Sequence, residues 1–213
     1  MGHNFTEAMA GTHLYPITDQ SLSGLSHAEQ VARLCSYGAK LIQLREKTDS
    51  PVKFFSQAVA ALRVARDCGA RIIINDRVDI ALALKADGVH LGQEDLAPEA
   101  ARRILGNDAI IGFSTHNLDQ ARLAADMPVD YIAVGPIFTT TTKHSPTPAI
   151  GLEGLARIRA TISTLPLVAI GGITSENKNL VLEAGADMVA VIRDIWVPAA
   201  DAERKTKHLL SVP

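Results

Sequence analysis

The sequence predicts a single (β/α)8 barrel, an α/β fold in which eight parallel strands alternate with eight helices. Eight short, continuously apolar segments are each followed by a segment with helical periodicity, which is typical of strands covered on both faces. A turn signature also recurs directly before strands, at 38–40, 86–88, 129–130 and 185–187. The 213 residues, 47% of them hydrophobic, are enough for one such domain. A flavodoxin-like sheet is the alternative, but it leaves three of the eight apolar segments unexplained.

Residues 1–12 are small and polar without a period, so we expect a flexible leader there and one barrel domain at 13–213. The expected strands are 14–19, 41–46, 72–74, 89–91, 110–113, 131–134, 167–170 and 188–192. The expected helices are 26–38, 51–69, 78–85, 98–105, one that begins at Asn117, one around Leu155, 176–184 and 201–210.

Local chemistry places several of these helix boundaries. Ser26 and Glu29 have the spacing of a capping box, and Gly38 is suited to follow the end of the same helix. Pro51 is suited to a first helical turn because its missing N–H has no intrahelical partner there. The long connection at 138–150 is rich in Thr and Pro, and loops of this length inside compact domains are usually lids or binding loops.

The composition argues against several classes of partner. Lys and Arg number 21 against 23 Asp and Glu, and this balance gives no reason to expect nucleic acid or a membrane surface as partner. No apolar run approaches the length of a membrane span, so we expect a cytoplasmic protein that acts on small molecules. Cys35 and Cys68 have no metal-binding spacing, and we expect buried, reduced thiols. Whether the protein forms a homo-oligomer stays open.

The carboxyl ends of the expected strands carry a set of polar residues, and in a barrel these ends form the active face. In chain order the set is Asp19, Gln43, Arg45, Lys47, Asn75, Asp76, Gln93, Asp95, Ser114, His116, Thr140, Thr142, Lys143, Gly171, Gly172, Ile192 and Arg193. This combination of cations, amides, hydroxyls and carboxylates is suited to a phosphorylated substrate with a divalent cation. His116 fits either an acid–base role or a positioning hydrogen bond.

Gln43, Arg45 and Lys47 alternate along one strand, so their side chains point the same way, and Leu44 and Glu46 point to the other face. Two cations on the inner side of a barrel need an anionic partner. A guanidinium fork beside an ammonium point charge suits a diphosphate. The alternative is a solvated edge strand, but a closed barrel has no edge.

Asp76 and Asp95 follow successive strands, and both carboxylates are expected to open onto the same face. Two carboxylates completed by phosphate oxygens and water are a usual way to bind Mg2+. The alternative is that each carboxylate caps the helix that follows it. The basic side chains that face this pair favour Mg2+ binding.

A phosphate site is expected after the seventh and eighth strands, a recurrent position in barrels. Gly171 and Gly172 allow backbone N–H groups to approach a phosphate closely, and Thr174 is expected to cap the next helix. Backbone donors at Ile192 and Arg193 complete this side.

Six motifs together resemble the thiamine-phosphate synthase family over nearly the whole chain. They are QLREK at 43–47, ND at 75–76, ADGVHLGQED at 86–95, GFSTH at 112–116, GPIFTTTTK at 135–143 and AIGGIT at 169–174. The resemblance implies a transferase of thiamine biosynthesis that couples a pyrimidine diphosphate to a thiazole phosphate and releases pyrophosphate. It also implies a dissociative mechanism, in which pyrophosphate leaves before the thiazole nitrogen attacks.

The resemblance assigns roles to individual residues. Asp76 and Asp95 would bind Mg2+, and Ser114 would contact the pyrimidine. The diphosphate would be held by Gln43, Arg45, Lys47, Asn75 and Lys143. The thiazole phosphate would be held by Thr140, Thr142, Gly172, Ile192 and Arg193. The wider substrate-binding set includes Leu44, Glu46 and Thr141, and the residues expected to act in catalysis are Arg45, Lys47, Ser114 and Lys143.

Thr139, Thr141 and Arg193 depart from the commonest family pattern, where Pro, an acidic residue and Ser are frequent. One rival is the related thiazole tautomerase, which would use a histidine at the position of His116. That relative typically lacks counterparts of Lys47 and Asp95, so the transferase is favoured. The other rival is a non-catalytic barrel that binds a phosphorylated ligand, but such a protein has no need for a carboxylate pair.

Overall fold

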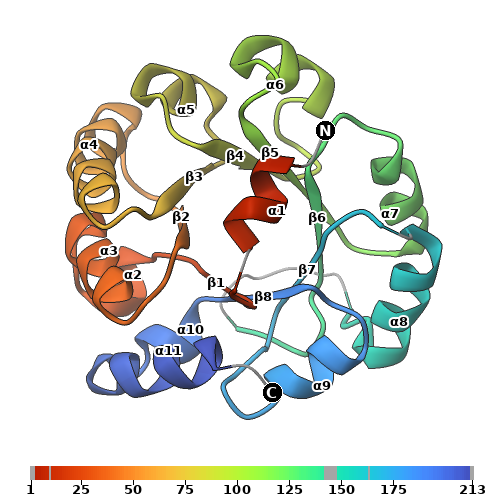
Figure 1. Ribbon diagram of the computed structural model, residues 1–213. Coiled ribbons are helices and arrows are strands. Elements are labelled where there is room, and N and C mark those ends of the chain that lie inside the picture. The colour runs from red at the N-terminus through yellow and green to blue at the C-terminus, as the bar shows by residue number, and fades with distance from the viewer. Residues whose placement is uncertain (1–2, 10, 142–147, 163, 212–213) are drawn as a thin grey trace.

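The computed structural model describes residues 3–9, 11–141, 148–162 and 164–211. Its eight parallel strands form one sheet that curves into a barrel, with helices around the outside (Figure 1). The strands are β1 (Leu14–Pro16), β2 (Leu41–Leu44), β3 (Arg71–Asn75), β4 (Gly88–Leu91), β5 (Ile110–Thr115), β6 (Tyr131–Val134), β7 (Leu167–Ile170) and β8 (Met188–Val191). A parallel bridge between Ile17 and Gln43 joins β1 to β2 and closes the barrel.

The helices follow the strands in the order that the sequence predicts. They are α1 (His3–Met9), α2 (Gln20–Ser23), α3 (His27–Ser36), α4 (Pro51–Asp67), α5 (Val78–Leu84), α6 (Pro98–Leu105), α7 (Leu118–Ala125), α8 (Gly151–Ile162), α9 (Lys178–Glu183), α10 (Arg193–Trp196), η1 (Ala199–Asp201) and α11 (Ala202–Leu210). The predicted (β/α)8 class is therefore confirmed. The capping box of Ser26 and Glu29 is present, and Pro51 occupies the first helical turn of α4. The four-residue helices α2 and α10 were not predicted, because one turn is too short to show a period.

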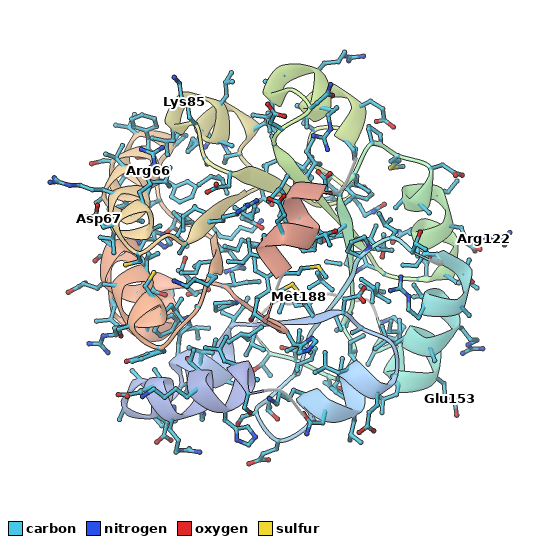
Figure 2. All side chains as sticks on the ribbon, in the orientation of Figure 1. Arg66, Asp67, Lys85, Arg122, Glu153 and Met188 are labelled. Atoms are coloured by element: carbon cyan, nitrogen blue, oxygen red, sulfur yellow. The ribbon has the colours of Figure 1, made fainter. Side chains whose placement is uncertain are left out.

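The strands are apolar throughout because both of their faces are buried. On β3, Ile72 and Ile74 pack against the surrounding helices, whereas Ile73 faces the barrel interior. Figure 2 shows the same division: Met188 lies at the centre of the barrel, and the charged side chain of Glu153 lies at its outer margin. No described helix has the length and apolarity needed to cross a membrane.

Three of the four recurring turns before the strands contain an aspartate that joins neighbouring strands. The carboxylate of Asp87 accepts from the backbone N–H of Ile72 at 2.7 Å, and that of Asp130 accepts from Ile111 at 2.8 Å. Asp187 makes the same bond to Leu167 at 2.7 Å. Each carboxylate thus satisfies an N–H at the amino end of the preceding strand, where the ladder is only beginning. This bond explains the aspartate that these three turns share.

Residues 1–12 were expected to form a flexible leader, and for residues 3–9 this expectation is wrong. These residues form α1, which lies across the centre of the barrel in Figure 1. Phe5 is fully buried, and its ring stacks on Tyr131 with ring centroids 4.1 Å apart. The helix is short and carries one large apolar residue, so its sequence has no visible period. Its order comes from the interior surface that it covers.

The cysteines differ in one respect from expectation. Both are free thiols, as predicted, but Cys35 and Cys68 are partly exposed rather than buried. Burial of its sulfur nevertheless raises the pKa of Cys35 to about 12, so this thiol stays protonated and unreactive at neutral pH.

We predict that Phe5→Ala lowers the free energy of unfolding by about 3 kcal/mol, because it removes a fully buried ring and leaves a cavity against Tyr131. Urea denaturation measures this change. Phe55→Ala on α4 is the matched control, since that ring is 38% exposed and its loss should have a much smaller effect. Equal effects of the two substitutions would show that α1 does not stabilise the barrel.

Candidate active site

A cavity of about 900 Å3 opens at the carboxyl ends of the strands. It collects most of the predicted site residues, namely Gln43, Arg45, Lys47, Asn75, Asp76, Asp95, Ser114, Thr140, Thr141, Gly172, Ile192 and Arg193. Leu44 and Glu46 are not among the residues that line it. Thr142 and Lys143 lie outside the described residues.

The alternation along β2 and the residues after it directs three polar side chains into the cavity. Gln43 is 3% exposed and donates through Nε2 to the hydroxyl of Tyr15 at 3.2 Å. Arg45 donates to a carboxylate oxygen of Asp19 at 2.7 Å, and Lys47 pairs with Asp76 at 2.5 Å. Arg45 and Lys47 are thus each paired with a carboxylate at the rim, where the side chain of Lys47 is still half-exposed.

The side chains of Leu44 and Glu46, two members of the wider substrate-binding set, have structural contacts outside the cavity lining. Leu44 is fully buried in the apolar layer between the barrel and its helices. Glu46 instead organises the loop between β2 and α4: one of its oxygens accepts from the backbone N–H groups of Lys47 at 2.8 Å, Thr48 at 2.7 Å and Asp49 at 3.1 Å. Both side chains point to the face opposite that of Gln43, Arg45 and Lys47, as the alternation predicts. Glu46 therefore shapes the loop that carries Lys47.

The electrostatics of Glu46 reflect this role. Burial of the carboxyl opposes its ionisation, but the hydrogen bonds from the following loop residues outweigh burial and lower the pKa of Glu46 to about 2. His27, fully buried, lies behind it with Nε2 at 3.6 Å from the other carboxylate oxygen. The Nδ1 atom of His27 is hydrogen-bonded to Thr18 at 2.8 Å. Burial lowers the pKa of His27, which keeps this ring neutral at physiological pH.

Neither predicted metal-binding carboxylate caps a helix. Arg77 is the N-cap residue of α5 and Ala97 that of α6, and neither cap makes a side-chain hydrogen bond. Asp76 has a left-handed backbone with φ 63°, a strained conformation for a residue with a side chain. Asp95 folds back to accept from the N–H of Gly92 at 2.7 Å. The capping alternative is therefore wrong for both residues.

The two carboxylates face each other. The pKa of Asp95 is raised, mainly because the carboxyl is partly buried and also because the negative charge of Asp76 lies beside it. Within the described ranges, no group of three or more His, Cys, Asp or Glu side chains is arranged to hold a metal. Two hard oxygen ligands on one rim still fit Mg2+, which usually keeps several waters and takes other ligands from substrate phosphates.

The floor of the cavity contains a polar cluster that the sequence reasoning did not assign. His90 on β4 is bonded through Nε2 to Ser114 Oγ at 2.8 Å and through Nδ1 to the Tyr131 hydroxyl at 2.9 Å. Nearby, the buried Nδ2 of Asn75 has no hydrogen-bond partner within the described structure, which is typical of a group that awaits a ligand. A histidine inside the apolar segment GVHL was the signal available in the sequence.

Two consecutive glycines with left-handed backbone follow β7 on the far side of the cavity. Gly171 and Gly172 both have positive φ, 101° and 65°. A Cβ on Gly172 would lie 2.8 Å from the carbonyl oxygen of Thr139, so only glycine lets the two loops approach. Thr174 does not cap α9, which begins after Asn177, and its hydroxyl instead accepts from the N–H of Glu176 at 3.3 Å.

His116, which was ambiguous in sequence, is held by the backbone. Its Nδ1 lies 2.7 Å from the carbonyl oxygen of Gly135, so the ring donates a hydrogen bond there. Its backbone N–H donates to Gln120 at 2.7 Å. The residue lines the cavity with a fixed ring orientation, which is the geometry of a positioning hydrogen bond.

A closed parallel barrel with a polar cavity at the carboxyl ends of its strands defines a (β/α)8 barrel of the enzyme type. The sequence model of the thiamine monophosphate synthase family matches residues 14–195. The chain therefore belongs to the thiamine monophosphate synthase family, a family of transferases.

Individual relatives agree with this assignment. Thiamine-phosphate synthase from Syntrophomonas wolfei is 44% identical over 200 residues, which cover 93% of this chain and 95% of that protein. The same enzyme from Chloroflexus aurantiacus is 44% identical over 203 residues, covering 93% of each chain. The solved structure of thiamine phosphate pyrophosphorylase from Pyrococcus furiosus superposes with a TM-score of 0.85 at 36% identity, covering 94% of this chain and 95% of that one.

We predict that Glu46→Gln removes a pH-dependent contribution to stability. Because the pKa of Glu46 is lowered to about 2, its contribution is present above the ordinary value of 4.5 and is lost as pH falls through about 2. The substitution should lower the free energy of unfolding by on the order of 2 to 3 kcal/mol at pH 7. The difference from the unsubstituted protein should shrink between about pH 4.5 and pH 2.

Chemical denaturation across this pH range measures the difference. Glu153→Gln on α8 is the matched control, because Glu153 is exposed on the outer margin of the barrel (Figure 2). A constant difference at every pH would mean that the loop bonds to Glu46 do not depend on its charge.

Proposed function

We propose that this protein is a thiamine-phosphate synthase. It would transfer the 4-amino-2-methylpyrimidin-5-ylmethyl group from its diphosphate to a thiazole phosphate and release pyrophosphate. The observation that carries the proposal is the facing pair of Asp76 and Asp95, set beside Arg45 and Lys47 on one cavity rim. Facing carboxylates repel each other, so they favour a cation between them, and the adjacent basic residues favour an anion on the other side of it.

The residues around this rim would stabilise a leaving diphosphate. Bound between Asp76 and Asp95, Mg2+ would offset the negative charge that builds up on the departing oxygens. Arg45 supplies a fork of donors and Lys47 a point charge, both already oriented by carboxylates before substrate arrives. The unpartnered amide of Asn75 supplies a further donor. We include Lys143 in this set from its motif position.

The thiazole phosphate would bind on the opposite side of the cavity. Close approach of the loop at Gly172 brings backbone donors to that side, and Arg193 adds a cation to the lining where the family frequently has serine. Thr140, Thr141 and Ile192 also line the cavity, and Thr142 is included by motif. The attacking thiazole nitrogen carries its own lone pair, so no general base is needed to activate it. The donors and cations around the diphosphate, which would stabilise charge on the leaving group, are what support a dissociative step.

Two other functions remain as rivals to test against. A thiazole tautomerase on the same barrel would move a proton at His116, and it would release no pyrophosphate. A ligand-binding barrel would bind the pyrimidine diphosphate without turnover. The carboxylate pair and Lys47 support the transferase over both. We also propose a cytoplasmic location, since the net charge of −2 offers no basic field toward nucleic acid or anionic lipid.

We predict that the purified protein forms thiamine phosphate and pyrophosphate when both substrates and Mg2+ are present, and that EDTA abolishes both products. The reason is that the carboxylate pair needs the cation to accept the diphosphate. Pyrophosphate release by a coupled assay and thiamine phosphate by fluorescence after oxidation provide the two readouts. Saturable binding without product would favour the ligand-binding barrel, and proton exchange on the thiazole without pyrophosphate would favour the tautomerase.

We predict that Asp95→Asn lowers turnover by on the order of 100-fold or more, because it removes an anionic ligand of the cation. Its free energy of unfolding should not fall, since asparagine can still accept from Gly92 and the repulsion with Asp76 is relieved. Asp76→Asn should lower turnover by a similar factor. Steady-state kinetics and thermal unfolding measure the two effects.

Asp67→Asn provides the matched control, because Asp67 is exposed at the end of α4 and outside the cavity (Figure 2). Near-normal turnover of Asp95→Asn together with a lower stability would instead indicate a structural role for the carboxylate.

A further inference from the structure

A chain of hydrogen bonds crosses the barrel interior from one side of the cavity to the other. Gln43 Nε2 donates to the Tyr15 hydroxyl at 3.2 Å, and this hydroxyl lies 3.0 Å from that of Tyr131. The Tyr131 hydroxyl lies 2.9 Å from His90 Nδ1, and His90 Nε2 lies 2.8 Å from Ser114 Oγ. Its five members come from five different strands or their ends, so the chain exists only in the closed barrel.

The middle of this chain is tightly enclosed. Tyr15 and Tyr131 are almost completely buried, and burial raises the pKa of both phenols, so each keeps its single proton at neutral pH. Phe5 of α1 stacks on one face of Tyr131, at an interplanar angle of 14°. A Cβ at Gly112 would lie 2.0 Å from the ring of Tyr131, so a glycine is required to make room for it. The Tyr131 hydroxyl is therefore held at one position.

Proton counting gives the chain a direction. The Tyr15 oxygen accepts from Gln43, so the one proton of Tyr15 is available for Tyr131. When Tyr15 donates to Tyr131, the proton of Tyr131 is available for His90 Nδ1, which then accepts. A neutral His90 thus carries its proton on Nε2 and donates it to Ser114 Oγ. The hydroxyl proton of Ser114 is left for a ligand in the cavity.

We propose that Tyr131 is a positioning residue that makes Ser114 a hydrogen-bond donor to a ring nitrogen of the bound heterocycle. The identity of that heterocycle, an aminopyrimidine, rests on the proposed function. The opposite direction would make Ser114 donate to His90 and only accept from the ligand, which suits an amino group instead. The direction of the chain therefore decides which edge of the ring Ser114 recognises.

Kinetics of two tyrosine variants test this proposal. Tyr131→Phe keeps the ring between Phe5 and Gly112 but removes the hydroxyl, so the KM for the pyrimidine diphosphate should rise about 10-fold. The change in kcat should be smaller, because the bond exists before the reaction begins. Tyr15→Phe should have a weaker effect, since Tyr131 can still donate to His90. Tyr37→Phe, outside the cavity at the end of α3, should leave both constants unchanged.

A double substitution separates positioning from general damage to the fold. In a Ser114→Ala background, Tyr131→Phe should change the KM by less than about twofold, because the donor that it orients is already absent. Additive effects of the two substitutions would contradict the proposal. So would a Tyr131→Phe variant with unchanged KM.

The tautomer of His90 can be read without any substrate. In protein labelled with 15N-histidine, the His90 signals, assigned with a His90→Gln variant, should show a protonated Nε2 and an unprotonated Nδ1. Tyr131→Phe should shift this balance toward the other tautomer. A proton on Nδ1 in the unsubstituted protein would overturn the proposal, whatever the enzyme assays show. Absence of turnover with the expected tautomer would contradict the proposed function and support the hydrogen-bond direction.

Discussion

The site depends on two carboxylates that the barrel forces to face each other. Asp76 follows β3 and Asp95 follows β4, and neighbouring parallel strands bring their carboxyl ends to one rim. The chain does not relieve this repulsion by turning the side chains into helix caps, although helices begin close behind both of them. Asp76 even adopts a strained backbone. Lys47 pairs with Asp76 and offsets part of the repulsion, and a bound cation would convert the rest into attraction.

The surrounding residues keep that rim ready for an anion. Arg45 and Lys47 are paired with Asp19 and Asp76, so their positions are set before any ligand arrives. Glu46, which lies between them in the sequence, accepts hydrogen bonds from the loop backbone. Because side chains alternate along β2, polar side chains point into the cavity from one face and structural side chains point to the other. This division explains why one short motif contains both kinds of residue.

The amino-terminal end of the barrel, which α1 covers, is linked to the cavity. Helix α1 covers the interior at that end, and Phe5 packs directly on Tyr131. Tyr131 in turn contacts His90, whose ring reaches Ser114 at the cavity. A segment far from the rim is therefore joined to it by packed rings and hydrogen bonds. The packing of α1 on the barrel and the position of Ser114 in the cavity are therefore coupled through Tyr131 and His90.

Several features of the site were readable from sequence because they are local. Period-two alternation placed Gln43, Arg45 and Lys47 on one face, and strand ends placed Asp76 and Asp95 on one rim. The same alternation turns the side chains of Leu44 and Glu46 away from the cavity lining, and their assignment to the substrate-binding set stays a prediction. The expectation that Thr174 caps the next helix was wrong, since Thr174 bonds within a turn before α9.

The sequence by itself determined the eightfold pattern of strands and helices and the polar rim, because these follow from periodicity and from the common direction of parallel strands. Only the tertiary structure decided that residues 3–9 form a buried helix and that five polar side chains join across the interior. Those contacts connect residues far apart in the chain. A short window of sequence does not predict that the ring of Tyr131 packs at Gly112, because the two residues meet only when the barrel closes.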